Sequence, residues 1–108
     1  MALGPLAFET VVVTVAAAGT SVAVSPIPRQ NTHTIRVMNE NATAIIYVAD
    51  ATAGGSLATT GVSIQPGTYQ DLPVGTGTKR PDPFFTLCVD SDINGSTARV
   101  TYFNAATT

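Results

Sequence analysis

Short runs of apolar and β-branched residues, separated by turn residues, recur along almost the whole chain. The first run, Phe8–Val15, is β-branched almost throughout, and Val and Thr suit a pleated strand because their stiff χ1 angles fit strands better than helices. Only Ala16–Ala18 has a trace of helical character, and Gly19 follows it at once. The pattern predicts about eight strands, at Phe8–Val15, Ser21–Val24, Thr32–Met38, Ala44–Ala49, Gly61–Ile64, Thr68–Leu72, Phe84–Val89 and Ala98–Phe103.

Turn residues between these runs indicate how the strands are connected. Pro66-Gly67 predicts a tight turn, and Asn94-Gly95 between two apolar runs predicts a β-hairpin. Ala44–Ala49 is apolar on both faces, so we expect a central strand covered on both sides. Short strands at this spacing favour an all-β fold, a single small antiparallel β-sandwich of Greek-key or jelly-roll type.

We expect three parts in the chain: an N-terminal arm at 1–8, the β-sandwich at 9–104 and a short C-terminal tail at 105–108. The arm is apolar, but its glycine and proline make it a poor strand. Leu3, Leu6 and Phe8 are therefore candidates for docking on a neighbouring subunit. An equally open alternative is that they close the bottom of the sandwich.

The charge content changes this picture, because only 11% of the 108 residues are charged, against about 25% in an ordinary domain. Such a surface is typical of a protein that meets other protein subunits. Five basic residues and a net charge of -2 supply no basic patch, which argues against nucleic-acid binding. Lys79 and Arg80 are candidates for contact with an acidic partner surface, although a solvated loop is the default interpretation.

One local pattern suggests a metal site. Asp90-Ser91-Asp92-Ile93-Asn94-Gly95 matches the first six positions of a calcium loop, where carboxylate and amide oxygens alternate before a glycine. Position twelve would be Thr101 rather than the glutamate that supplies two ligand oxygens. The pattern therefore favours a polar hairpin loop whose Asp and Asn side chains cap backbone amides.

The remaining reactive residues do not form a catalytic constellation. His33 has no Cys, Asp or Glu at ligand spacing, and alternation places it on the same strand face as Ile35 and Val37. Cys88 lies in an apolar run and is expected to be a small buried residue. Gly75–Lys79 lacks the spacing of a phosphate-binding loop. We predict no catalytic, cofactor or metal site, and no enzyme activity.

Three short motifs carry a resemblance to a known group of proteins. Ile35-Arg36-Val37-Met38-Asn39 leads to an apolar run with Tyr47-Val48, and Pro66-Gly67-Thr68-Tyr69 follows later. These segments, within about residues 32 to 72, resemble small β-rich proteins of tailed-bacteriophage head-gene clusters, several of which are capsid decoration (cement) proteins. The resemblance implies a virion protein on the outer capsid surface that binds the major capsid protein and itself, commonly as a homotrimer.

The function expected is therefore structural: decoration and stabilisation of an icosahedral capsid by bridging neighbouring major capsid subunits. A neck, tail or fibre-associated protein is a second structural reading, and a carbohydrate-binding β-sandwich is the alternative from another class. No apolar stretch reaches the roughly 18 residues that span a bilayer, and the N-terminus lacks the basic region of a signal peptide. We expect synthesis in the host cytoplasm and no membrane partner.

Overall fold

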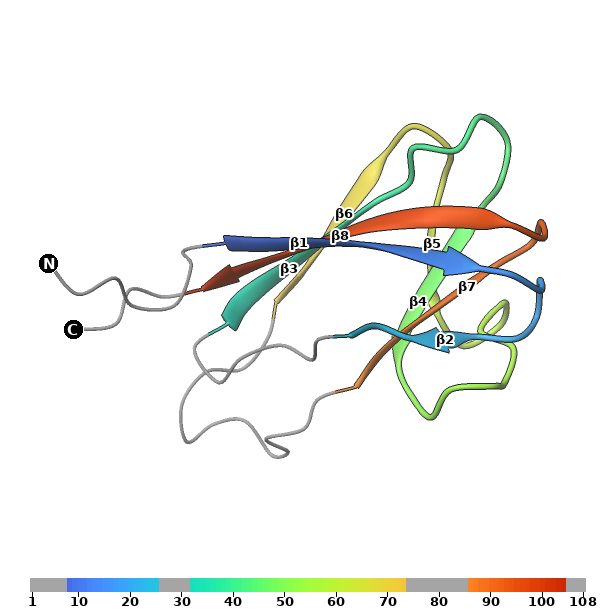
Figure 1. Cartoon of the computed structure of the whole chain (residues 1–108), viewed down its shortest axis with the longest axis horizontal. Helices are drawn as coiled ribbons and strands as arrows, with labels where there is room; N and C mark the ends of the chain where they lie inside the picture. The colour runs from blue at the N-terminus through green and yellow to red at the C-terminus, as the bar shows by residue number, and fades with distance from the viewer. Residues whose placement is uncertain (1–7, 26–31, 74–85, 105–108) are drawn as a thin grey trace, which may run out of the picture.

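The chain folds into strands throughout the part that the computed structural model describes, which is residues 8–25, 32–73 and 86–104. A strand forms in each of the eight predicted regions, and these ranges contain no helix. The strands follow one another in the order shown in Figure 1: β1 Phe8–Val15, β2 Val22–Ala23, β3 Thr32–Met38, β4 Ile46–Asp50, β5 Val62–Ile64, β6 Tyr69–Pro73, β7 Leu87–Ser91 and β8 Ser96–Asn104.

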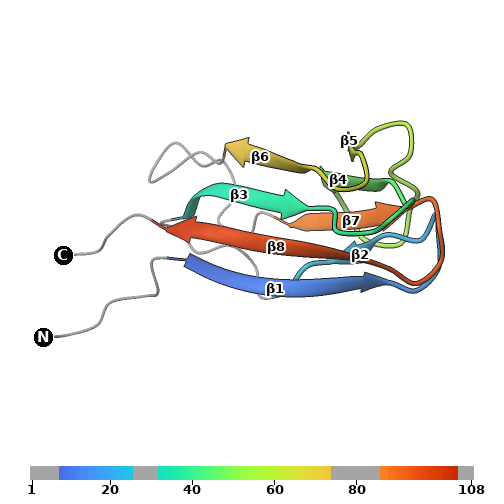
Figure 2. The same ribbon diagram turned by 90° about the horizontal axis from the view of Figure 1, so that it is seen from above.

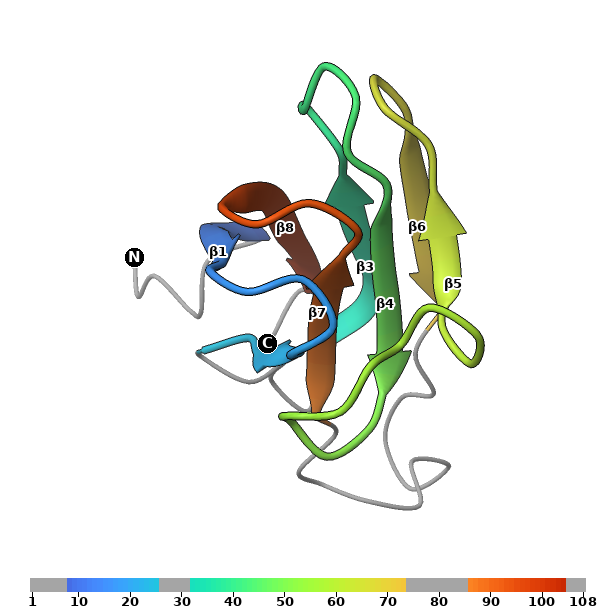
Figure 3. The ribbon, with the colours of Figure 1, turned by 90° about the vertical axis from the view of Figure 1, so that its right-hand side faces the viewer.

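The strands form two antiparallel sheets of four. The first sheet has the order β1-β8-β3-β6 and the second the order β2-β7-β4-β5. Figures 2 and 3 show the two sheets as separate layers, with β1 and β2 at one side and β5 and β6 at the other. The predicted all-β class is confirmed, as a β-sandwich-like fold.

The core lies between the two sheets because alternate residues of each strand face inward. In β3, for example, Ile35 and Val37 are fully buried while Arg36 between them is not. Each fully buried aliphatic side chain stabilises the fold by roughly 1.5–3 kcal/mol relative to exposure. The cluster draws on both sheets and contains Val13, Val15, Val24, Ile35, Val37, Ile46, Val48, Ile64, Leu87, Val89, Ala98, Val100 and Tyr102.

The hairpin predicted at Asn94-Gly95 is wrong, although the turn itself is present. Gly95 has the left-handed φ of 77° that such a turn needs, but β7 pairs with β2 and β4 while β8 pairs with β1 and β3. The turn therefore crosses from one sheet to the other. The Gly95 amide donates to Val15 O at 2.8 Å, so the turn is held by the end of β1 rather than by a β7–β8 ladder.

The Pro66-Gly67 turn also joins the two layers. It is confirmed as a tight turn, since the Thr68 amide donates to Gln65 O at 3.2 Å and Gly67 has a φ of 75°. It connects β5 of the second sheet to β6 of the first. Both turns thus carry the chain between layers.

The strand buried on both sides is β7, not the predicted Ala44–Ala49 segment. β4 does lie inside its sheet, but Tyr47 and Ala49 are only half-buried. Every residue of β7 is buried, because the chain beyond β4 crosses its outer surface. The Cys88 thiol contacts Ala51 O there, at 3.1 Å.

The predicted placement of His33 beside Ile35 and Val37 is also wrong. A register shift between Thr32 and Thr34 interrupts the alternation of β3. Thr32 is therefore buried together with Ile35 and Val37, and His33 is exposed. Its Nδ1 lies 2.9 Å from Thr34 Oγ1, a purely local contact at the surface.

Candidate functional site

The outer surface of the first sheet is built by four paired strands. Residues directly opposite one another in an antiparallel sheet lie on the same face, so the register defines three rows across β1, β8, β3 and β6. We call this surface the Arg36 face. Its rows are Phe8, Phe103, Thr34 and Pro73; Thr10, Thr101, Arg36 and Asp71; and Val12, Arg99, Met38 and Tyr69.

Large apolar side chains are exposed on this face. Phe8 is 61% exposed, Val12 52% and Tyr69 54%, although side chains of this kind are usually better covered. They come from strands at opposite edges of the sheet, and the row between them is polar. Large apolar side chains exposed beside polar residues are typical of surfaces that contact another macromolecule.

Arg36 lies at the centre of the face and is held from three sides. Its Nε donates to Asp71 Oδ1 at 2.8 Å and its Nη2 to Asp71 Oδ2 at 3.1 Å, a two-point ion pair. The guanidinium carbon lies 4.4 Å from the centre of the Tyr69 ring and 5.4 Å from that of Phe103. The hydrogen bond from Arg36 lowers the pKa of Asp71, while partial desolvation opposes this, so the pair stays ionised at neutral pH.

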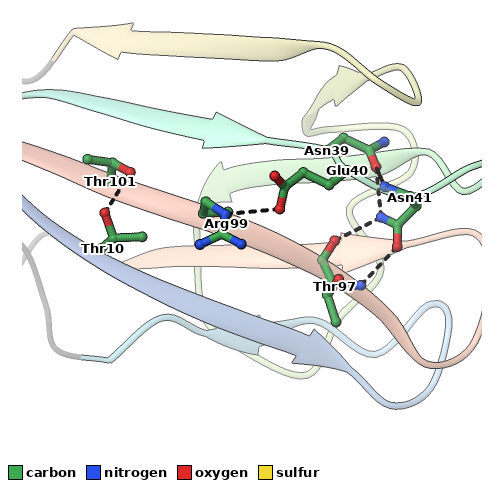
Figure 4. Close-up of polar contacts among 7 residues, drawn as sticks. All are labelled: Thr10, Asn39, Glu40, Asn41, Thr97, Arg99 and Thr101. Carbon is green, nitrogen blue, oxygen red and sulfur yellow. Dashed lines mark hydrogen bonds and ion pairs between the residues drawn. The ribbon is translucent and has the colours of Figure 1, made fainter.

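A second ion pair and a hydroxyl pair complete the polar part of the face, as Figure 4 shows. Arg99 Nε donates to Glu40 Oε1 at 2.9 Å, and the hydroxyls of Thr10 and Thr101 lie 3.1 Å apart across β1 and β8. Both arginines of the face therefore have a carboxylate partner. The face carries charge without a net sign, so its binding partner does not need to be strongly acidic or basic.

The polar groups of the Arg36 face bind one another or an immediate neighbour, as the two arginine–carboxylate pairs and the contact between Thr34 and His33 show. Exposed aromatic side chains, methionine and arginine are the residue types enriched where protein surfaces meet. The face is therefore the candidate functional site, as a surface for contact with protein.

One of the predicted contact residues lies on this face. Phe8, which the sequence assigned to the arm, is the first residue of β1 and stands opposite Phe103. Leu3, Leu6, Lys79 and Arg80 lie outside the described residues. The structure thus pairs Phe8 with Phe103 and places it on the same face as Arg36 and Tyr69, residues that the sequence analysis did not single out.

The capping reading of the Asp90–Gly95 loop is confirmed. Asp90 is fully buried, and its carboxylate accepts hydrogen bonds from the amides of Gly19 at 2.9 Å, Leu57 at 2.8 Å and Ser91 at 2.8 Å. The side chains of Asp92 and Asn94 also accept from backbone amides, Asp92 from Ile45 and Asn94 from Ala18. Within residues 8–25, 32–73 and 86–104, no group of three His, Cys, Asp or Glu side chains is arranged to hold a metal ion.

Cys88 is confirmed as a buried residue. Burial raises the pKa of its thiol, and a hydrogen bond with the Ala51 backbone only partly opposes that effect. Because the thiolate is the reactive species, this thiol is doubly protected, by its protonation and by its packing.

We expect Cys88 to react with a small thiol reagent about 100-fold more slowly in the folded protein than in urea. A matched variant, Ser63→Cys on exposed β5, should react at nearly the same rate in both conditions. The rates are measured by the absorbance of the released thiolate. Rapid labelling of folded Cys88 would contradict the burial described here.

The sequence could not reveal the Arg36 face because its rows join residues far apart in the chain. Thr10 and Thr101 are 91 positions apart, yet their hydroxyls are in contact. The usable local signal was alternation, since Thr34, Arg36 and Met38 occupy every second position of their strand. Alternation identifies an outward face but not the strands that lie next to it.

Comparisons with protein-family models, with curated proteins and with solved structures found no match. The described part of the chain also has no helix long and apolar enough to cross a membrane.

Proposed function

We propose that this protein is a structural component of a bacteriophage virion, which decorates the capsid and stabilises it by bridging neighbouring major capsid subunits. The observation that carries the proposal is the Arg36 face. It is broad, exposes large apolar side chains, and has its arginines already paired with carboxylates. A surface of this composition supports lasting contact with other protein subunits.

The strand order supports a jelly-roll arrangement, which is the finer topology that we propose for this fold. β1, β3, β6 and β8 belong to the first sheet, and β2, β4, β5 and β7 to the second. In both sheets the first and last strands of the set are neighbours, as expected when an antiparallel ribbon is rolled up. Jelly rolls are common among viral capsid domains, although lectins and cupins share them, so the function is argued from the surface.

The low charge content supports the same proposal. At 11% charged residues, the chain has few groups that would favour exposure of its whole surface to water. A capsid presents many identical sites, and repeated attachment lets a modest affinity at each site produce firm overall binding. A protein of this kind acts sterically and by adhesion, without catalysis.

The proposal is tested by counting copies of this chain in purified virus particles, using quantitative mass spectrometry against the major capsid protein. We expect a number comparable to that of the capsid protein. A handful of copies would overturn capsid decoration in favour of a neck, tail or fibre role. Complete absence from particles would overturn the virion proposal altogether.

A truncation tests the proposed role of the arm. Removal of residues 1–7 leaves β1 whole, because Phe8 is its first residue, and we expect the truncated chain to fold but to lose capsid attachment. Binding to purified capsids that lack the protein is measured by co-sedimentation. Attachment equal to that of the full chain would refute the arm as a contact.

A further inference from the structure

The four strands at the edges of the two sheets differ strongly in length. Within the described residues β2 has 2 residues, β5 has 3, and β6 has 5 and ends at Pro73, which cannot donate a ladder hydrogen bond. β1 has 8 residues. Short strands and proline are the usual protections of a sheet edge, so β1 is the edge that lacks them.

The chemistry of β1 also favours pairing. Its register with β8 runs without a shift from Phe8 opposite Phe103 to Val15 opposite Ser96, so no bulge twists the edge away. From Thr10 to Val15 it consists only of Thr and Val, which have high strand propensity. Its one charged residue, Glu9, lies at the start of the strand, is half-buried and accepts a hydrogen bond from Asn104 Nδ2 at 3.4 Å.

We propose that β1 is an association edge for a second copy of this chain. Two β1 strands pair antiparallel about a two-fold axis, so that the first sheets of both subunits join into one continuous sheet. The contact is self-complementary, because each subunit offers the same row of backbone donors and acceptors. The inference goes beyond capsid decoration and does not depend on it.

The orientation of the side chains limits which registers the two β1 strands can adopt. Residues opposite one another must lie on the same face, so exposed even-numbered positions meet even-numbered ones. If the two-fold axis passes between the two Val12 residues, Val12 lies opposite Val12 of the partner subunit and Thr10 lies opposite Thr14 of the partner subunit. We call this the pair centred on Val12. Valine pairs and threonine pairs across strands are both favourable.

The position of Glu9 favours this register over its neighbour. Centred on Val12, the pair places Glu9 at its end, opposite Val15 of the partner subunit. The two Glu9 side chains are then roughly 20 Å apart at about 3.4 Å per residue, against roughly 14 Å in a pair centred on Val11. A pair centred on Val11 would instead press Glu9 against Val13 of the partner subunit, toward the interior of the joined sheet.

The association would enlarge the candidate functional site. A two-fold axis perpendicular to the sheet keeps both Arg36 faces on the same side, so Phe8, Val12 and their partner equivalents form one surface across the joined sheets. The proposed assembly is a two-fold pair. It therefore differs from the homotrimer that the resemblance to decoration proteins implies, and the mass of the particle in solution distinguishes the two.

The experiment is light scattering coupled to size-exclusion chromatography on the full chain over a range of concentrations. We expect a dimer that dissociates on dilution. Val12→Glu places two carboxylates directly opposite each other on the axis, and we expect only monomer at concentrations where the unaltered chain is mostly dimer. The matched control is Val62→Glu, because Val62 is also an exposed valine on an edge strand, at 45% exposure against 52% for Val12. It should remain dimeric.

A second measurement uses a conservative variant that keeps the strand intact. Val12→Cys should be joined to its partner by a short bifunctional thiol reagent, giving a covalent dimer on a denaturing gel, whereas Val62→Cys should not. A chain that is monomeric or trimeric at every concentration would overturn the proposal. So would a Val12→Glu variant that remains dimeric, or equal cross-linking at the two positions. Virion copy number is unaffected by any of these results, so the two proposals fail separately.

Discussion

Replacing Asp90 with alanine is expected to lower the free energy of unfolding by about 3–5 kcal/mol. The carboxylate accepts three backbone amides, and two of them belong to other loops, at Gly19 and Leu57. Alanine would leave these amides without their acceptor at a position that is fully buried. The loss should appear as a lower urea midpoint with an unchanged slope.

Two further variants separate this role from a general effect of removing charge. Asp92→Ala removes an exposed carboxylate that accepts a single amide, that of Ile45, and should lower the stability by about 1 kcal/mol or less. Asp90→Asn retains one acceptor oxygen but directs its side-chain NH2 group at a backbone amide. Its loss of stability should therefore lie between those of Asp92→Ala and Asp90→Ala. Equal losses in Asp90→Ala and Asp92→Ala would show that Asp90 does not organise these loops.

Replacing Asn39 with aspartate should cost about 3–4 kcal/mol, although the two side chains have the same shape. The Asn39 side chain is buried, and its Nδ2 donates to Ala44 O at 2.7 Å and to Ile64 O at 2.8 Å. A carboxylate would place an oxygen against both carbonyls. The loss should shrink near about pH 4, where a protonated carboxyl regains one donor.

The same substitution elsewhere is the control. Asn94→Asp should change the stability by less than about 0.5 kcal/mol, because Asn94 is exposed and uses only its Oδ1, as an acceptor from the Ala18 amide. Thermal and urea unfolding of both variants measure the difference. A stability loss at Asn39 that is no larger than that at Asn94 would refute the donor role of the Asn39 amide.

The Asn39 position also explains how the turn after β3 is anchored. Asn41 donates from its Nδ2 to Asn39 Oδ1 at 2.7 Å and to Thr97 O at 2.8 Å, and its own Oδ1 accepts from the Thr97 amide, as Figure 4 shows. The Asn41 side chain thus pairs with β8 much as a strand residue would. Two asparagines on either side of Glu40 therefore fix where β3 ends and the chain crosses to β4.

The sequence predicted which segments are strands because that information is local. Alternation and β-branched residues mark Phe8–Val15 and Thr32–Met38 without reference to any partner. Pairing is not local. The Asn94-Gly95 turn has the same chemistry whether it closes a hairpin or crosses between sheets, and here its contacts with Val15 and Ala18 belong to the crossing.

The candidate site likewise depends on strand pairing, which is not local information. Four predicted contact residues lie outside the described ranges, and the surface that the structure does describe depends on strands that are not neighbours in sequence. Arg36 meets Asp71 because β3 pairs with β6, and Phe103 because β3 pairs with β8. Knowledge of register would have been needed to assemble that surface from the sequence.

The pairing of the first strand with the last also determines when this protein can complete its fold in a cell. β1 finds its partner only after β8 has been synthesised, and the 80 residues from 16 to 95 lie between them. At about 5–20 residues per second, the ribosome needs about 4–16 s to add them. Throughout that interval the nascent Thr- and Val-rich segment lacks the strand with which it pairs in the folded protein, so this is the stage of synthesis at which aggregation is most favoured.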